Sequence, residues 1–260
     1  MNIVVCIKQV PDTNEVKIDP KTGTLIREGV PSIINPDDKN ALEEALCLKD
    51  KYGAHVTVIT MGPPQAGNAL TEALAMGADE AVLITDRAFA GADTLATSHA
   101  LAGALKKLDY DIVFAGRQAI DGDTAQVGPE VAEHLNLPQV TYVEKVDIVD
   151  DNTISVRRAW EDGYEVIKVN TPVLLTAIKE LNTPRYMNIN NIFGVYDKEV
   201  KLWTAHDIDV DTELLGLNGS PTRVMKSMTK EAKGQGELIN LPVKEAVEYT
   251  VSKLMENHYI

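Results

Sequence analysis

The part of the chain best suited to bind a ligand is a long polar loop that directly follows an apolar run. It reads Ala115-Gly116-Arg117-Gln118-Ala119-Ile120-Asp121-Gly122-Asp123-Thr124-Ala125-Gln126-Val127-Gly128-Pro129-Glu130. The spacing of Val127, Val131 and Leu135 predicts a helix after this loop. The first N–H groups of a helix lack intrahelical partners, so those of residues 124–126 would attract a diphosphate.

Individual residues of this loop suggest how such a group would be held. Asp123 or Thr124 is a candidate cap for the helix. Gly122 and Gly128 would let the backbone approach a ligand closely, and Arg117 would add a cation near a phosphate or a flavin. The alternative is an ordinary loop followed by a capped helix, with no ligand.

Three other loops follow short apolar runs and begin helical patterns. They are Ile34-Asn35-Pro36-Asp37-Asp38, Thr60-Met61-Gly62-Pro63-Pro64 and Gly91-Ala92-Asp93-Thr94-Leu95-Ala96-Thr97-Ser98. Taken singly, the first two are more typical of helix starts than of ligand contacts. In the third, Asp93 or Thr94 is a candidate cap that is also available to a ligand. Together the loops would line one edge of a parallel sheet.

Several other kinds of site are disfavoured. The chain has no Gly-x-x-x-x-Gly-Lys-Ser/Thr run, and Gly234-Gln235-Gly236 does not continue into Gly-x-Gly-x-x-Gly. The five histidines lie far apart and the two cysteines, Cys6 and Cys47, form no Cys-x-x-Cys pair, so no metal site is expected. The net charge of −14 disfavours nucleic acids and anionic membrane surfaces as partners.

The composition indicates a cytoplasmic globular protein. With 260 residues, 44% of them hydrophobic, the chain can bury a large core. The N-terminal run Met1-Asn2-Ile3-Val4-Val5-Cys6-Ile7-Lys8 has no basic leader and only the length of a strand, so we do not expect a signal peptide. Every apolar stretch is too short to cross a bilayer, and membrane insertion is not expected.

The elements that must position the loops alternate between strands and helices. Apolar runs predict buried strands at 3–7, 56–60, 81–85, 112–115 and 173–178, and helical spacing predicts helices around 42–46, 66–73 and 101–108. This alternation predicts an α/β fold with a doubly wound, mostly parallel sheet. Ligands of such sheets usually lie at the carboxyl ends of the strands.

Three segments depart from the alternation. Residues 16–26 predict a hairpin, and residues 140–169 predict an antiparallel extension at one sheet edge. Residues 190–260 predict a C-terminal arm that ends in an amphipathic helix, Val243 to Met255. Because this arm has few apolar runs, it would be stable mainly against another surface, either a partner subunit or its own domain.

In this order along the chain, these segments resemble the β-subunit family of electron-transfer flavoproteins. The matching runs are Val4–Asp12, Asn35-Pro36, Ala41–Leu46, Ala73–Asp79, Gly116–Asp121 and Leu181–Tyr186. The resemblance covers the chain from Met1 to the arm. It implies a heterodimer whose α subunit holds one FAD, a Rossmann-like nucleotide-binding domain over residues 1–189, and an arm over residues 190–260 that wraps the α subunit.

Within this family, simple electron carriers hold AMP in the β subunit, whereas the bifurcating type holds a second FAD there. This sequence resembles the bifurcating type in Val10–Thr13, Gly91–Ser98 and Asp121–Pro129. The resemblance implies that NADH gives a hydride to this FAD. One electron then passes through the α-subunit FAD to an acyl-CoA dehydrogenase of the butyryl-CoA type, and the other passes to ferredoxin or flavodoxin. A non-bifurcating carrier with structural AMP is the alternative, and a separate nucleotide-sensing domain is a third interpretation.

The resemblance also implies roles for individual residues. Cys6, Asn35 and Met61 would border the adenosine, and Thr94 and Arg117 would lie nearer the flavin. The loop would complete the cofactor site with Ala119, Ile120, Asp121, Gly122, Asp123, Thr124, Ala125, Gln126, Val127, Gly128 and Pro129, and its part from Asp123 onward would cradle the phosphates. No catalytic side chain is expected, because a flavin performs its own redox chemistry.

A separate part of the resemblance concerns a partner protein. Pro184, Arg185 and Tyr186 match the start of the family's partner-recognition loop, which implies docking on the acyl-CoA dehydrogenase. An arginine and a tyrosine on an exposed loop are residue types that commonly anchor protein interfaces.

Overall fold

The structure is a computed structural model that describes residues 1–12, 31–223, 225, 236 and 238–260. These residues form two compact units. The first contains all the strands and helices α1 to α5, and the second contains helix α6. The hairpin predicted at residues 16–26 lies outside the described residues.

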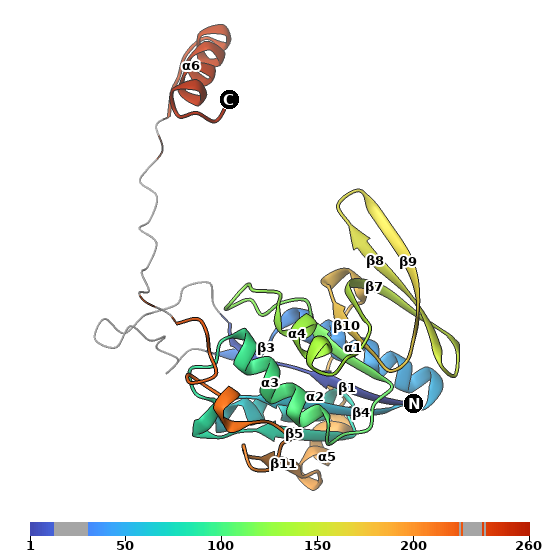
Figure 1. Cartoon of the computed structure of the whole chain (residues 1–260). Helices are drawn as coiled ribbons and strands as arrows, with labels where there is room; N and C mark the ends of the chain where they lie inside the picture. The colour runs from blue at the N-terminus through green and yellow to red at the C-terminus, as the bar shows by residue number, and fades with distance from the viewer. Residues whose placement is uncertain (13–30, 224, 226–235, 237) are drawn as a thin grey trace. The chain divides into compact units, whose positions relative to one another are not determined.

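A nine-stranded sheet forms the centre of the first unit, in the order β11-β5-β4-β1-β6-β10-β7-β8-β9 (Figure 1). The parallel part consists of β1 (Asn2–Cys6), β4 (His55–Met61), β5 (Glu80–Ile84), β6 (Ile112–Gly116), β10 (Val173–Ala177), β11 (Val200–Trp203) and β7 (Gln139–Asp150). Antiparallel strands β8 (Thr153–Trp160) and β9 (Gly163–Asn170) extend it beyond β7. The predicted α/β fold and its antiparallel extension are confirmed.

Helices cover both faces of the sheet. They are α1 (Pro36–Tyr52), α2 (Gly67–Met76), α3 (Thr94–Leu105), α4 (Val127–His134) and the short α5 (Ile189–Gly194), with 3-10 turns η1 (Pro64–Ala66), η2 (Arg87–Phe89), η3 (Lys179–Leu181), η4 (Val195–Asp197) and η5 (Thr212–Leu214). Side chains alternate across a strand, so Ile3 and Val5 of β1 pack in one apolar cluster with α1 and α2, while Val4 packs in another with α3 and α4. Burial on both faces explains why the strands read as continuous apolar runs.

The order of the strands creates a topological switch point between β1 and β6, which we call the crevice because open α/β sheets bind ligands in a crevice at such a point. From β1 the chain crosses to β4 and β5 on one side, and it then returns to form β6 and β10 on the other side. Neighbouring strands β1 and β6 therefore lead into connections that diverge at their carboxyl ends. Open α/β sheets bind ligands at such a point. Two short strands, β2 (Gln9–Pro11) and β3 (Ser32–Ile34), pair with each other in the connection that follows β1.

The first unit continues past residue 189. Strand β11 pairs with β5, and the segment after it packs on the start of α3, where the Asp93 carboxylate accepts hydrogen bonds from the backbone and hydroxyl of Thr222. The compact unit ends only at Met225. That residues 190–260 wrap a partner stays a prediction.

The second unit, as far as it is described, consists of α6 (Val243–Glu256), which confirms the predicted final helix. Its apolar side chains include Val247, Val251 and Leu254, which share one helical face and are all exposed in this unit. Among the described residues of both units, no helix combines the length and apolar character that a bilayer crossing requires.

Candidate functional site

The carboxyl ends of β1 and β6 are joined by the first turn of α1. Asp38 Oδ2 accepts a hydrogen bond from the Lys8 N–H at 2.7 Å, and Oδ1 accepts one from the Gly116 N–H at 3.0 Å. A Cβ at residue 116 would overlap Asp38 Oδ1 and would lie 2.7 Å from the Asp38 backbone nitrogen, so only glycine fits there. Burial raises the pKa of Asp38 to about 7, although its hydrogen bonds oppose that shift. Sequence reasoning missed Asp38 because it reads as an ordinary acidic residue of a first helical turn.

The start of the long loop is fixed by Asn35, which precedes α1. Its side-chain amide donates to the Gln118 carbonyl at 2.8 Å, and its side-chain oxygen accepts from the Ile120 N–H at 3.0 Å. Asn35 is fully buried, so these bonds are shielded from water. The structure therefore brings Asn35 and the loop together at the crevice, as two of the predicted site segments.

The two cations nearest the crevice are paired with carboxylates. Lys8 Nζ lies 2.6 Å from Asp121 Oδ1. Arg117 Nε lies 3.4 Å from Asp37 Oδ2, and the Arg117 backbone N–H donates to the Ala177 carbonyl. The structure places Arg117 against the first turn of α1, and its contact with a ligand stays a prediction.

Helix α4 begins later than the sequence suggests. Gln126 occupies the cap position without a side-chain cap bond, so the prediction that Asp123 or Thr124 caps the helix is wrong. The reason is local backbone geometry: Asp123 and Ala125 have φ angles of +50° and +53°, which insert left-handed turns before the helix. The Asp123 carboxylate instead accepts a hydrogen bond from Gln118 Nε2 at 2.9 Å.

These turns produce a row of backbone donors. Within the described part of the chain, the N–H groups of residues 124–128 donate no hydrogen bond. A left-handed residue followed by right-handed Gln126 is the arrangement that turns successive N–H groups toward a common point and favours an anion there. We call residues 124–128 the N–H nest.

The two glycines of this region have different surroundings. A Cβ on Gly128 would lie 2.7 Å from Thr176 Cγ2, so this glycine allows α4 to pack closely on β10. A Cβ on Gly122 would meet nothing within 4 Å. At Gly128, the backbone of α4 therefore closely approaches strand β10 of the sheet.

Thr94 connects the starts of two helices. Asp93 caps α3 by accepting from the Ala96 N–H at 3.1 Å, which confirms that prediction. The Thr94 hydroxyl lies 3.3 Å from Gln126 Oε1 and 3.1 Å from Glu130 Oε1. It thus links α3 to the N–H nest.

The ends of β1 and β4 present neutral groups. Burial raises the pKa of the Cys6 thiol to about 12, so it stays protonated at neutral pH. Next to Met61, the buried Thr60 Oγ1 has no hydrogen-bond partner in the described structure, and the same holds for Gln9 Oε1. Unpaired buried polar atoms suit a ligand with donors of its own, such as a nucleobase. Sequence reasoning named Met61 and missed these two.

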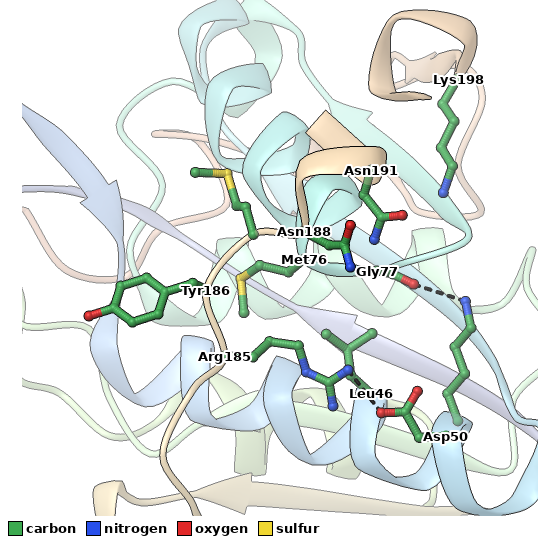
Figure 2. Close-up of a pocket in the computed structure, with 11 residues that line it drawn as sticks. Leu46, Asp50, Met76, Gly77, Arg185, Tyr186, Asn188, Asn191 and Lys198 are labelled. Carbon is green, nitrogen blue, oxygen red and sulfur yellow. Dashed lines mark hydrogen bonds and ion pairs between the residues drawn. The ribbon is translucent and has the colours of Figure 1, made fainter. Parts of the chain in front are cut away.

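A second cleft, of about 550 Å³, lies between α1, the end of α2 and the segment that leads into α5 (Figure 2). The Arg185 guanidinium contacts α1 through Glu43 Oε2 and Asp50 Oδ2, both at 2.9 Å. Tyr186, in contrast, is 97% exposed. Of the three residues predicted to bind a partner, Pro184 is half-buried, Arg185 fixes the segment to α1 and Tyr186 faces solvent.

Tyr186 belongs to an apolar surface that we call the α5 patch. Its other members are exposed aromatic and aliphatic side chains of α5 and η4, namely Ile189, Phe193 and Tyr196. Sequence reasoning did not identify these residues, although Ile189, Ile192, Phe193 and Tyr196 follow helical spacing, because the run is too short to predict a helix by itself. Exposed aromatic side chains of this kind are candidates for a contact surface.

Comparison with known proteins identifies relatives over the whole chain. A family model described as the electron transfer flavoprotein domain matches residues 22–208. The electron transfer flavoprotein subunit beta of Clostridium acetobutylicum is 78% identical over 100% of both chains. Subunit CarD of the caffeyl-CoA reductase-Etf complex of Acetobacterium woodii is 59% identical, and the acryloyl-CoA reductase electron transfer subunit gamma of Anaerotignum propionicum is 47% identical, each over 100% of both chains. The chain therefore belongs to the electron transfer flavoprotein family, as a β subunit.

Proposed function

We propose that this β subunit binds FAD in the crevice between β1 and β6, and that with its α subunit it takes electrons from NADH. One electron goes to an acyl-CoA dehydrogenase and the other to ferredoxin or flavodoxin. The observation that carries this proposal is the N–H nest, which opens beside α3 at the carboxyl edge of the sheet. A diphosphate needs several convergent donors, and residues 124–128 supply them.

Backbone donors, rather than side-chain cations, would hold the diphosphate. Lys8 and Arg117 are paired with Asp121 and Asp37, so a neighbouring carboxylate offsets the attraction of each for an anion. Asn35 fixes the beginning of the loop, and Thr94 fixes its end through Gln126 and Glu130. Such a rigid set of dipoles is already oriented before a ligand arrives.

The adenosine would lie toward β1 and β4, as proposed for Cys6 and Met61. The Thr60 hydroxyl would donate a hydrogen bond to the base or accept one from it, and Gln9 Oε1 would accept one, since both atoms lack other partners in the described structure. The neutral Cys6 thiol adds no charge against an uncharged adenine. Bound FAD would supply hydride acceptance and the release of single electrons.

The names of two relatives support the partner part of the proposal. One belongs to a caffeyl-CoA reductase complex and another to an acryloyl-CoA reductase, so a CoA-ester dehydrogenase is the partner class expected here. The α5 patch would contact this dehydrogenase, with Tyr186 as an anchor and Arg185 and Pro184 as supports. The exposed apolar face of α6 would contact the α subunit.

The second candidate function is a non-bifurcating carrier that holds AMP. The N–H nest favours it as well, since one phosphate would occupy the place of two. The two functions differ in flavin content and in their reaction with NADH.

The first prediction is that the heterodimer, purified after co-expression with its α subunit, contains two FAD and is reduced by NADH. We would count FAD by absorbance after extraction and follow reduction anaerobically. One FAD accompanied by AMP, with no reaction with NADH, would establish the carrier function instead. A heterodimer with neither nucleotide in the β subunit would contradict both.

A further inference from the structure

A single carboxylate joins the two strands that border the crevice. Asp38 is 7% exposed and accepts one backbone hydrogen bond from each side, at Lys8 after β1 and at Gly116 at the end of β6. It stands close enough to Gly116 that no side chain fits between them.

We propose that Asp38 is a positioning residue whose ionised carboxylate sets the spacing of β1 and β6 and thereby makes nucleotide affinity depend on pH near neutrality. This inference rests on the proposed nucleotide site. Asp38 acts through the backbone at Lys8 and Gly116 and needs no contact with the ligand.

Ionised and protonated Asp38 do not hold the strands equally well. The carboxylate offers an acceptor to each of its two N–H donors, whereas the protonated acid turns one oxygen into a donor that faces another donor. Gly116 is also the last residue of β6, directly before the loop that leads to the N–H nest. A weaker bond at Gly116 therefore loosens the part of the loop that Asn35 and Lys8 hold.

The surroundings place this titration near neutral pH. Burial raises the pKa of Asp38 to about 7, the neighbouring Asp37 carboxylate adds to the rise, and the hydrogen bonds oppose it. On β1, the Cys6 thiol is neutral below pH 12 or so. The two nearby cations are paired elsewhere, Lys8 with Asp121 and Arg117 with Asp37. No cation within the described residues forms an ion pair with Asp38.

The second prediction tests this with the heterodimer, titrated with FAD between pH 6 and pH 8 after loosely bound nucleotide has been removed by dialysis. If only the ionised form is competent, Kd rises about tenfold from pH 8 to pH 6 in the wild type, since the competent fraction falls by that factor. FAD itself has no phosphate that titrates in this range. Asp38→Asn and the smaller Asp38→Ser should bind more weakly at pH 8 and show a flat profile.

Asp79→Asn is the matched control. Asp79 also accepts a strand N–H, from Val56 at 2.9 Å, and pairs with Lys49. It lies at the amino edge of the sheet, next to the start of β5. This variant should keep the tenfold rise of the Kd for FAD between pH 8 and pH 6, which we call the pH step, even if it changes the stability of the heterodimer.

The outcomes separate this inference from the proposed function. A wild type without a pH step, Asp38 variants that keep the step, or a control that loses it would each overturn the role of Asp38 while FAD binding stands. A wild type that takes up no FAD would count against the proposed function, and AMP then becomes the probe. The phosphate titration of AMP is common to all variants, so the difference between their profiles still reports on Asp38.

Discussion

At the scale of single residues, the crevice depends on close approaches that leave no space for a side chain. Gly116 lies against Asp38, and Gly128 lies against Thr176 of β10. Both glycines have ordinary negative φ angles, so the requirement is steric and not conformational. Gly122, six residues before Gly128, has no neighbour within 4 Å of a built Cβ.

The third prediction compares Gly128 with Gly122. Gly128→Ala should destabilise the heterodimer by about 1–3 kcal/mol, because the new methyl group overpacks the buried face between α4 and β10. Gly122→Ala should leave stability within about 0.5 kcal/mol, since it meets open space. Chemical denaturation monitored by circular dichroism measures both, and equal losses would contradict the packing role of Gly128.

Residue-level geometry also explains what the sequence could not predict. Asp123 and Thr124 are ordinary N-cap residue types, yet left-handed conformations at Asp123 and Ala125 move the start of α4 to Val127. No glycine marks those positions, so nothing in the residue types signals them. The ion pairs of Arg117 and Lys8 join residues 80 or more positions apart in sequence, and local patterns carry no information about such contacts.

At the scale of elements, the sequence predicted the positions of the main parallel strands. The runs at 3–7, 56–60, 81–85, 112–115 and 173–178 all became parallel strands, because burial on both sheet faces demands continuous apolar residues. The short β2, β3 and β11 escaped prediction. Strand β11 alternates too few residues to give a periodic signal, and its pairing with β5 spans more than a hundred residues. Helix α5 has only six residues, so the helical spacing of Ile189, Ile192 and Phe193 covers too short a window to predict a helix.

The fourth prediction concerns the surface that α5 presents. Tyr186→Ala combined with Phe193→Ala should raise the KM for the acyl-CoA dehydrogenase at least tenfold, because two exposed aromatic anchors are lost. Flavin content should not change. Tyr164→Ala on β9 removes a tyrosine that is 61% exposed and is the control, so an equal effect of Tyr164→Ala would argue against docking at the α5 patch.

At the scale of the whole molecule, the chain divides into a large unit that holds the crevice and a smaller one that is described only at residues 236 and 238–260. The apolar side chains of α6 are exposed and no α6 residue is buried. A helix of this kind gains most of its stability from a surface that covers its apolar face. In the predicted heterodimer, the α subunit would cover this apolar face of α6.

The fifth prediction tests α6 directly. Val247→Asp together with Val251→Asp should sharply reduce the amount of α subunit that copurifies with a tagged β subunit, since charges then replace the apolar face. Glu248→Gln, on the same helix, should leave recovery unchanged. If the double variant still forms the heterodimer at wild-type yield, α6 does not contribute to subunit pairing.

The contact between Gly116 and the start of α1 also limits which substitutions the chain can accept. A methyl group at 116 would overlap the Asp38 carboxylate, and it would also lie 2.7 Å from the Asp38 backbone nitrogen and 2.8 Å from the Asp37 carbonyl carbon. A shorter side chain at 38 would therefore leave no room for alanine at 116, and it would remove the acceptor that holds Lys8 and Gly116 in place. Position 116 accepts a side chain only if the first turn of α1 itself moves.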